Sequence, residues 1–457
     1  MQADRSTQLL ALLKKGVLSS AELEKTLDLS QSAVSRHLRA LIAQGQVIRL
    51  GSTRGARYGL LRSISNIGSR WQLRQIDPTG NVQLVGQLHA LVANEYFFQP
   101  SNATFSALSA VTHGIPYFLQ DQRPGGFLGR AVPRRFPELG LPQRVIDWTD
   151  DQYLQYLTQR SADAVGDLIL GDEAFNQYIE LQKQRPPVES EARKTEFPRL
   201  ARDVMLGGLP GSSAHGEHPK FTTLLRRGND YQPALVKFSP STATAVGQRW
   251  SDLLIAEHRA HELLSRNAVP TVRSEIHQFD GVTFLQMDRF DRCGLEGRIG
   301  VTSLHSIDTA RYGALDNWVA SATRLRRDRR IDEPTLELIR LVFTFGGLIA
   351  NTDRHFGNLA MLDQYDGRFH LAPVYDMLPM LFAPQNDEIF ARVFVPPDPT
   401  ADTMTVYRRA RELAEEYWRL ISEDSHVSSE FRAIAAACGS TLAALPRTGA
   451  YAYQGAP

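Results

Sequence analysis

Residues 351–358 have the sequence NTDRHFGN, and this stretch indicates the fold more clearly than any other. It follows an apolar run at 338–350 that predicts a helix. A predicted short hairpin comes next, and the chain then reaches Asp376. Because the hairpin turns the chain back on itself, we expect Asp353, Asn358 and Asp376 to converge on one point.

This set of side chains suits phosphoryl transfer. The reaction needs a carboxylate that orients or deprotonates the attacking hydroxyl, and oxygen ligands that hold Mg²⁺ against a triphosphate. We therefore predict Asp353 as the catalytic base and Asn358 and Asp376 as the Mg²⁺ ligands. The D-x-x-x-x-N spacing is also that of the protein-kinase catalytic loop; it is weak by itself, and the second Asp strengthens it.

Two upstream segments predict where ATP binds. Residues 207–221, GGLPGSSAHGEHPKF, form a glycine- and serine-rich loop, whose backbone N–H groups can approach phosphate oxygens. The loop matches neither the Walker pattern nor the spaced glycines of eukaryotic kinases. A predicted strand, ALVKF, then carries Lys237, and Glu257 lies in the predicted helix 246–265, where the partner of a phosphate-binding lysine is expected. For Lys237 alone, an edge-strand lysine is the alternative.

The N-terminal segment differs from the rest in charge. Residues 1–62 hold ten Lys and Arg against four Asp and Glu, a net charge of +6. The whole chain has a formal net charge of +1, so the remainder carries −5. The near-neutral total therefore conceals a basic module suited to nucleic acid.

The same segment has the pattern of a winged helix-turn-helix. We expect three short helices, the third capped by Ser30 and ended by Gly45. Two strands, 47–50 and 57–60, then form a basic hairpin. The stretch SQSAVSRHLRALIAQGQVIRLG resembles the recognition-helix region of bacterial winged-helix regulators.

We predict that the third helix and the hairpin contact operator DNA. Polar and basic side chains at the start of a recognition helix reach base edges, and a basic hairpin reaches phosphates or the minor groove. The predicted DNA-binding residues are Gln31, Ser32, Ser35, Arg36, Arg39, Arg54 and Arg57. A winged helix that docks on protein is the alternative.

Composition excludes several protein classes. The chain has 457 residues, 42% of them apolar and 22% charged, as in globular proteins of about two or three domains. Two cysteines cannot form a disulfide framework or a cysteine-based zinc site. No signal peptide or membrane-spanning run is evident, so we expect a cytoplasmic protein without a membrane partner.

Five segments together resemble the HipA family of bacterial serine/threonine kinase toxins: GSSAHGEHPKF, ALVKFSP, FLQMDRFDR, NTDRHFGN and PVYDM. The resemblance implies an α+β, bilobal, protein-kinase-like fold preceded by the winged helix-turn-helix. It suggests a DNA-binding domain at 1–66, an N-terminal kinase lobe with the phosphate loop at 67–288, and a mainly helical C-terminal lobe at 289–457. ATP and Mg²⁺ are the implied cofactors.

The resemblance also implies roles for single residues. Ser212, and less closely Ser213, match the loop serine that this family autophosphorylates, which switches the kinase off. Met287 and Asp288 lie where the adenine-binding hinge runs. The implied ATP-binding residues are Lys237, Glu257, Met287, Asp288, Ser212, Ser213, Ala214, His215 and Gly216.

The resemblance implies partners as well. The target class is an aminoacyl-tRNA synthetase, and a separate helix-turn-helix antitoxin is usual in the family, although the fused winged helix can replace it. Winged helices often bind DNA as dimers, which leaves a homodimer open.

The sequence departs from the family in two places. His215 stands where many members have Gly, and Gly357 stands where some have Lys. The second change removes a cation near the transferred phosphate, for which Arg354 is the candidate replacement.

Two other functions remain open at this stage. One is a transcriptional regulator whose kinase-like body senses nucleotide without transferring phosphate. The other is a small-molecule phosphotransferase, which would have an acidic, substrate-sized pocket. A further arginine cluster at 324–330 could bind a target, but a solvated helix end is the simpler interpretation.

Overall fold

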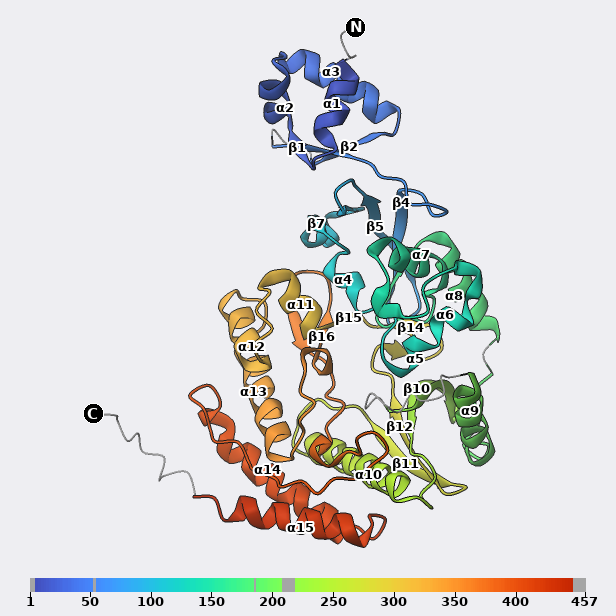
Figure 1. Ribbon diagram of the computed structural model, residues 1–457, viewed down its shortest axis with the longest axis vertical. Helices are drawn as coiled ribbons and strands as arrows, with labels where there is room; N and C mark the ends of the chain where they lie inside the picture. Colours follow the sequence, from blue (N-terminus) through green and yellow to red (C-terminus); the bar gives the residue numbers. More distant parts are fainter. Residues whose placement is uncertain (1–4, 52–54, 185, 208–217, 447–457) are drawn as a thin grey trace, which may run out of the picture.

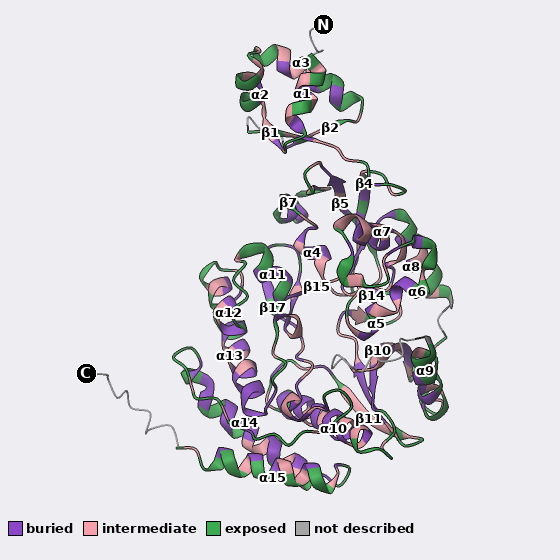
Figure 2. Cartoon of the chain, viewed as in Figure 1, coloured by how far each residue is buried: buried purple, intermediate pink, exposed green. Residues whose placement is uncertain are grey.

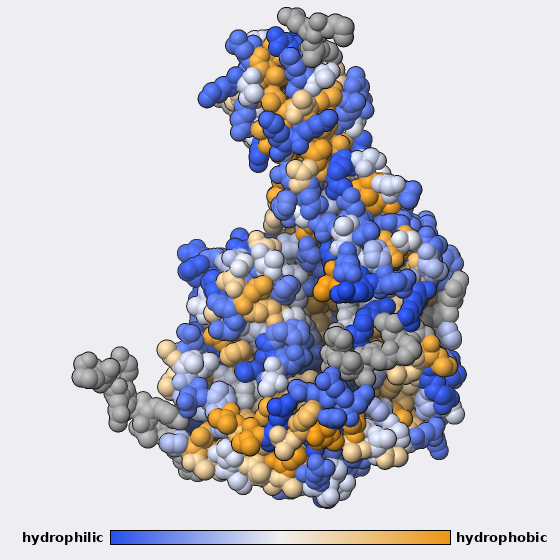
Figure 3. All heavy atoms as spheres, in the orientation of Figure 1, coloured by the Kyte–Doolittle hydropathy of each residue, from blue (hydrophilic) through white to orange (hydrophobic). Residues whose placement is uncertain are grey.

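The computed structural model describes residues 5–51, 55–184, 186–207 and 218–446. Figure 1 shows an elongated α+β molecule in which a small N-terminal domain stands beyond a larger body. A narrow waist joins the two parts in the space-filling view (Figure 3). The arrangement separates the basic module from the rest of the chain.

The N-terminal domain is the predicted winged helix-turn-helix. Its sheet has the strand order β1-β3-β2. Ser19 and Glu22 form a capping box at the start of the second helix, and the hydroxyl of Ser30 accepts from the N–H of Ala33 at the start of the third. The elements are α1 (Arg5–Leu13), β1 (Leu18–Ser19), α2 (Ser20–Leu27), α3 (Gln31–Ala43), β2 (Val47–Leu50) and β3 (Arg57–Leu60).

The waist is a packed contact. Apolar side chains of the winged helix, including Val17 and Leu50, cluster with Leu91 and Phe97 of the body. Next to them, Arg62 donates to Asp151 at 2.5 Å and, through other nitrogens, to the hydroxyl of Tyr96 and a backbone carbonyl. The winged helix is therefore held against the body by burial and by a hydrogen-bonded cation.

The first part of the body is built on a five-stranded antiparallel sheet of order β7-β6-β5-β4-β8. Its strands are β4 (Arg70–Ile76), β5 (Val82–Ala90), β6 (Glu95–Pro100), β7 (Val111–His113) and β8 (Leu168–Leu170). Its helices are α4 (Tyr117–Gln120), α5 (Gly126–Arg130), α6 (Val132–Arg135), α7 (Asp150–Arg160) and α8 (Asp172–Gln184). The chain between α7 and α8 enters the sheet as β8. Gly171 follows β8 with a φ of +87°, and a Cβ there would lie 2.9 Å from the carbonyl of Thr158.

The next part is a four-stranded antiparallel sheet of order β11-β12-β10-β9, covered by two helices. The elements are α9 (Arg193–Gly207), β9 (Lys220–Arg227), β10 (Asp230–Phe238), α10 (Ala245–Arg266), β11 (Ser274–Phe279) and β12 (Val282–Asp288). The stretch predicted as one N-terminal lobe, 67–288, thus contains two separate sheets with separate apolar clusters.

The C-terminal part is mainly helical. A two-stranded ribbon, β13 (Arg292–Cys293) and β14 (Gly297–Arg298), leads into it. A small sheet follows, β15 (Val301–Ser303), β16 (Ala360–Asp363) and β17 (Phe369–Leu371), in that order. The helices are α11 (Leu304–Arg311), α12 (Trp318–Arg327), α13 (Glu333–Leu348), α14 (Met404–Glu423) and α15 (Ser429–Ala443).

Burial places the main core between these helices. Figure 2 shows buried residues concentrated on α10, α13 and α14, and one apolar cluster joins α10 to the C-terminal helices. The helix expected at 338–350 begins earlier, at Glu333, because Asp332 caps it by accepting from the N–H of Thr335. No helix in the described part of the chain has the length and apolar character needed to cross a membrane.

Candidate active site

A buried lysine joins three distant segments of the body. Nζ of Lys237 on β10 lies 2.7 and 2.8 Å from the two carboxylate oxygens of Glu257 on α10. It also donates to Oδ1 of Asp376, which follows β17. The side chains of Lys237 and Glu257 are 6% and 0% exposed, whereas that of Asp376 is 29% exposed. We call the region around Lys237, Asp353, Asn358 and Asp376 the cleft. One cation therefore contacts two carboxylates from different segments of the body.

The titration of this group follows from that contact. Burial by itself would raise the pKa of Asp376, but the ammonium of Lys237 outweighs it and lowers the pKa to about 2. Burial opposes the charge of Lys237, yet Asp376 and Glu257 together raise its pKa. Burial raises the pKa of Glu257 despite the contact with the lysine. Asp376 and Lys237 are therefore both charged at neutral pH.

The predicted catalytic loop lies beside this group. Nδ2 of Asn358 donates to the backbone carbonyl of Asp353 at 2.8 Å and lies 3.3 Å from its Oδ2. These bonds orient the amide so that Oδ1 of Asn358 remains as an oxygen ligand. Burial raises the pKa of the Asp353 carboxyl, with Asp376 adding to the effect and His355 opposing it. Asp353 is half-exposed, so it can meet a substrate hydroxyl.

Asn351 holds the two acidic segments together. Its Nδ2 donates to the backbone carbonyl of Asp376 at 3.0 Å, and its Oδ1 accepts from the N–H of Asp353 at 3.0 Å. The side chain is 2% exposed. Sequence reasoning assigned Asn351 no role, although its place at the head of the motif was the available signal.

The backbone around Asp376 is strained and tied to the smaller lobe. Asp376 has a φ of +53°, in the left-handed region that non-glycine residues rarely occupy. Just before it, Val374 exchanges backbone hydrogen bonds with the 270–272 segment, and the hydroxyl of Tyr375 donates to the carbonyl of Gly357 at 2.9 Å. These contacts fix the approach of Asp376 to the catalytic loop.

Arg354 does not take the place of the absent lysine at 357. Its Nη1 donates to the carbonyl of Phe343 at 2.8 Å, and its guanidinium lies 4.6 Å from the centre of that ring. Gly346 and Gly347 allow this approach, since a Cβ at either position would come within 3.0 Å of the arginine. The expectation that Arg354 steadies the transferred phosphate is therefore wrong: the side chain anchors the loop to α13.

The predicted hinge residues lie at the end of β12. Met287 is buried in an apolar cluster with Leu254 and Leu285. Asp288 pairs with Arg227 at 3.0 Å, and its N–H donates to the carbonyl of Arg273. That amide is therefore already used within the protein, and the adenine-binding role stays a prediction based on position.

Residues 208–217 of the predicted phosphate loop lie outside the described residues, and so do the predictions for Ser212, Ser213, Ala214, His215 and Gly216. The last two residues of the predicted loop, Lys220 and Phe221, belong to β9. Lys220 is the cross-strand partner of Lys237. Directly opposed residues of an antiparallel pair share a face. The side chain of Lys220 therefore lies on the same face of the sheet as that of Lys237.

A cavity of about 1180 Å³ opens beside this face. It is lined by the 121–138 segment with α5 and α6, by parts of α7 and α8, and by Thr222 of β9. Five arginines and four acids line it, so it is not an acidic pocket. None of the residues proposed for phosphoryl transfer lines it.

A magnesium ion fits the polar groups at the cleft. Among the described residues no set of three or more His, Cys, Asp or Glu could hold a metal. The predicted ligands are one carboxylate and one amide oxygen, which leaves the remaining positions to phosphate and water, as Mg²⁺ prefers. No hydrogen bond to Oδ2 of Asp376 or Oδ1 of Asn358 occurs in the described part of the chain, so both oxygens are open to an ion.

The predicted DNA-binding residues lie mostly on one exposed surface. Gln31, Ser32, Arg36 and Arg39 of α3 are exposed, and Ser35 is half-buried. Arg57 on β3 is exposed as a residue, but its Nη2 donates to the carbonyl of Val17 at 2.9 Å. Arg54 lies outside the described residues. The recognition surface is therefore carried by α3.

Three families of known sequences match the chain. Residues 7–48 match the bacterial regulatory proteins of the arsR family, residues 67–179 the middle domain of YjjJ-like toxins, and residues 212–446 the HipA-like C-terminal domain. The chain is 31% identical to Toxin YjjJ of Escherichia coli (strain K12) over 437 residues, which cover 94% of this chain and 96% of that protein.

Two solved structures show distant similarity. One is a chain of the Shewanella oneidensis MR-1 toxin–antitoxin complex of HipA, HipB and operator DNA, with a TM-score of 0.48 and 12% identity over 81% of this chain and 95% of that one. The other is the Helicobacter pylori proinflammatory kinase CtkA, with a TM-score of 0.36 and 14% identity over 48% of this chain and 86% of that one.

Proposed function

The chain belongs to the YjjJ-like toxins with a HipA-like C-terminal domain, and from this premise we propose that it is an ATP-dependent serine/threonine protein kinase with its own DNA-binding domain. The observation that carries the proposal is the contact of Lys237 with Glu257 and Asp376, next to Asp353 and Asn358. These groups provide a phosphate-binding cation, two metal ligands and a base.

Each side chain has a defined task in the proposed reaction. Glu257 holds the lysine in place, and Nζ of Lys237 donates to phosphate oxygens when nucleotide enters the cleft. Asp376 and Asn358 would hold Mg²⁺, which neutralises charge on the phosphates. Asp353 orients the substrate hydroxyl and accepts its proton, and the raised pKa of this carboxyl makes it a better base.

We further propose a protein substrate. The large cavity beside β9 contains more arginines than acids, whereas a phosphotransferase for cationic small molecules needs an acidic pocket. The family resemblance suggests an aminoacyl-tRNA synthetase as the target and Ser212 or Ser213 as the site of autophosphorylation. We propose 1–66, 67–288 and 289–457 as the functional units.

Incubation of the full chain with Mg-ATP and cell lysate, followed by mass spectrometry, tests the proposal. We expect phosphoserine on the chain itself and on a small number of lysate proteins, and loss of both in Asp353→Ala. Asp402→Ala, at an exposed carboxylate outside the cleft, is the matched control and is expected to retain transfer. Transfer at the normal rate in Asp353→Ala would disprove the role of this residue. Operator binding without any transfer by the wild-type chain would instead indicate a regulator.

A further inference from the structure

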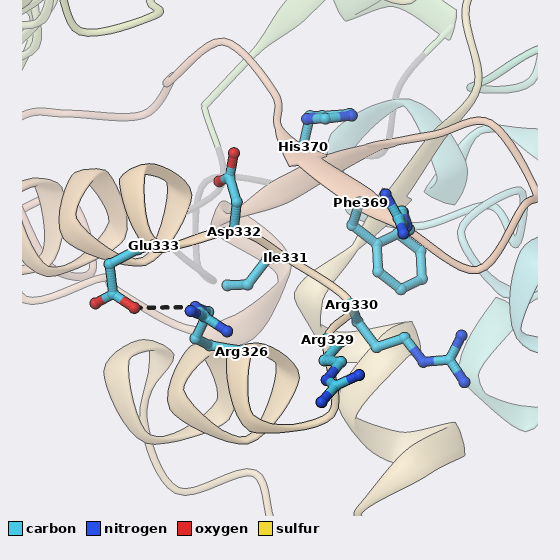
Figure 4. A pocket seen from close by; sticks show the side chains of 9 residues that line it. Arg326, Arg329, Arg330, Ile331, Asp332, Glu333, Phe369 and His370 are labelled. Atoms are coloured by element: carbon cyan, nitrogen blue, oxygen red, sulfur yellow. Dashed lines mark hydrogen bonds and ion pairs between the residues drawn. The ribbon is translucent and has the colours of Figure 1, made fainter.

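A second, smaller cavity lies away from the cleft, where α12 turns into α13 and β17 begins (Figure 4). Its volume is about 310 Å³. Ile331 and Phe369 line it and are buried. In Figure 4, Arg326 and Arg329 lie below Ile331, Arg330 extends to one side, and Asp332 and His370 lie above. No residue proposed for phosphoryl transfer lines it, so the cavity is separate from the active site.

The two acidic residues of this cavity are already engaged. The carboxylate of Glu333 accepts from Nε of Arg326 at 2.9 Å, the contact drawn as a dashed line in Figure 4. Asp332 accepts from the N–H of Thr335 at 2.9 Å and thereby caps α13. Glu333 is therefore paired with a cation, whereas Asp332 keeps its negative charge and offsets one of the arginines of the cavity.

Three further arginines have no such partner. Arg329 and Arg368 are exposed, and Arg330 is half-buried, with Nη1 donating to the carbonyl of Gly367 at 3.0 Å. Within the described residues no ion pair joins any of the three to a carboxylate, whereas the other arginines of the same turn, Arg324, Arg326 and Arg327, each have one. Like charges held around one cavity favour binding of an anion.

The backbone holds these arginines in place. Arg329 has a φ of +58°, a conformation that glycine or asparagine adopts more easily than arginine. Its N–H donates to the carbonyl of Arg326 at 3.0 Å, and the carbonyl of Arg330 accepts from the N–H of Phe369 at 2.8 Å. The N–H of Arg330 also donates to the carbonyl of Leu325 at 2.8 Å, so Arg329 occupies the left-handed position that commonly ends a helix. The turn is thus bonded to both α12 and β17.

The elements that begin at the cavity end at the catalytic loop. Helix α13, of 16 residues, leads to Asn351, and β17 leads to Asp376. At a rise of about 1.5 Å per residue, α13 separates the two places by roughly 24 Å. A ligand in the cavity is therefore too far away to take part in the transfer itself.

We propose that this arginine pocket binds a dianionic phosphate ester, carried by a small molecule or by a phosphorylated serine or threonine side chain. Guanidinium groups match phosphate oxygens in geometry and bind them through paired, charge-assisted hydrogen bonds. A single carboxylate would leave most of the positive charge unpaired. The pocket is at the lower end of small-molecule sites in volume, which fits a phosphoryl group with a few further atoms. The proposal does not depend on the kinase activity.

Titration calorimetry on the full chain tests it with three probes: O-phosphoserine, a short peptide containing phosphoserine, and the same peptide without phosphate. We expect the phosphorylated probes to bind and the unphosphorylated peptide not to bind. In Arg329→Asn combined with Arg368→Gln, we expect the affinity to fall by about tenfold or more, because each arginine supplies charged hydrogen bonds. Asparagine at 329 tolerates the left-handed backbone.

Arg327→Gln is the matched control, because Arg327 lies on the same turn, is exposed and pairs with Asp328 at 3.3 Å, but does not line the pocket. Equal affinity for the two phosphorylated probes identifies a small ester as the ligand, and tighter binding of the peptide identifies a phosphoprotein. If the double variant melts early, Arg368→Gln alone replaces it. The proposal is overturned if the phosphorylated probes do not bind, if the unphosphorylated peptide binds equally well, or if Arg327→Gln causes an equal loss. It is also overturned if the double variant loses affinity for duplex DNA and not for the phosphorylated probes.

Discussion

The winged helix and the cleft around Asp376 both present positive charge toward phosphate, but the two regions hold that charge differently. Arg36 and Arg39 of α3 stand exposed on one contiguous segment. Lys237 is 6% exposed and is held by carboxylates 20 and 139 residues away. An exposed arginine is hydrated and acts nearly independently, whereas a buried lysine depends on its partners. Substitutions in the cleft should therefore affect folding and function together, and substitutions on α3 should affect DNA binding alone.

The largest effect is expected from Lys237→Met. This variant leaves Glu257 buried without its cation, which costs about 3 kcal/mol of stability, and removes the phosphate-binding group. We expect transfer to be lost and the denaturant midpoint to fall. Lys237→Met combined with Glu257→Gln should recover much of the stability but none of the activity. Equal stability of the single variant and the wild type would show that the pair is not coupled to folding.

A smaller effect is expected at Asn351, which touches the backbone of both acidic segments but neither metal nor nucleotide in the proposed site. In Asn351→Ala we expect kcat to fall by about 10- to 100-fold, because catalysis is sensitive to small displacements of the base and ligands. The KM for ATP should change little, since Lys237 and Glu257 are intact. A rise in KM with unchanged kcat would argue against a positioning role.

Asp363 is a buried carboxylate without a cation in contact, and its pKa provides the third test of the comparison. Asp363 accepts from Tyr365 N–H, Thr302 and Tyr117, and burial raises its pKa to about 7, opposite in direction to Asp376. The neighbouring Asp167 is also buried, and burial raises its pKa to about 6.

The folded chain binds the proton of the Asp363 carboxyl more tightly than the unfolded chain does. The free energy of unfolding should therefore decrease as pH rises from about 4 to about 7. Asp363→Asn should remove most of that slope, with a gain of the order of 1 kcal/mol or more at pH 8, since one pKa unit corresponds to about 1.4 kcal/mol. Thermal melts from pH 4 to pH 8 measure it. A slope unchanged by the substitution would contradict the assignment.

The smallest effect is expected from Arg36→Gln on α3. We expect operator affinity to fall several-fold and the salt dependence of binding to weaken by about one counterion, with kinase activity and melting temperature unchanged. Band-shift titrations at several salt concentrations measure it. Lys14→Gln, at an exposed lysine that follows α1 and is outside both α3 and the hairpin, is the comparison; an equal loss in that variant would mean that net charge, not the recognition surface, binds DNA.

The two regions also differ in how far the sequence predicted them. The winged helix was predicted nearly element by element, because its caps and turns are local: Ser30 caps α3 within three residues, and Gly45 follows its end. The polar groups of the cleft were predicted by spacing. Their contacts were not, because Lys237 and Asp376 meet only when two lobes pack together.

Arg354 and the arginine turn show the same limit. Charge near the predicted catalytic loop suggested a phosphate contact for Arg354, but two glycines in the last turn of α13 leave room for its side chain against that helix. The 324–330 cluster looked like a solvated helix end, and three of its arginines do pair with nearby acids. Only the packing of β17 against the turn brings Arg368 beside Arg329 and Arg330.

The amino-acid sequence alone determined the family, the α+β class, the basic N-terminal module and the residue types available for phosphoryl transfer, because these depend on local periodicity, capping and motif spacing. The tertiary structure decided which charges neutralise each other and which remain unpaired. That outcome depends on contacts between residues more than a hundred positions apart and on burial, which strengthens each electrostatic interaction once water is excluded.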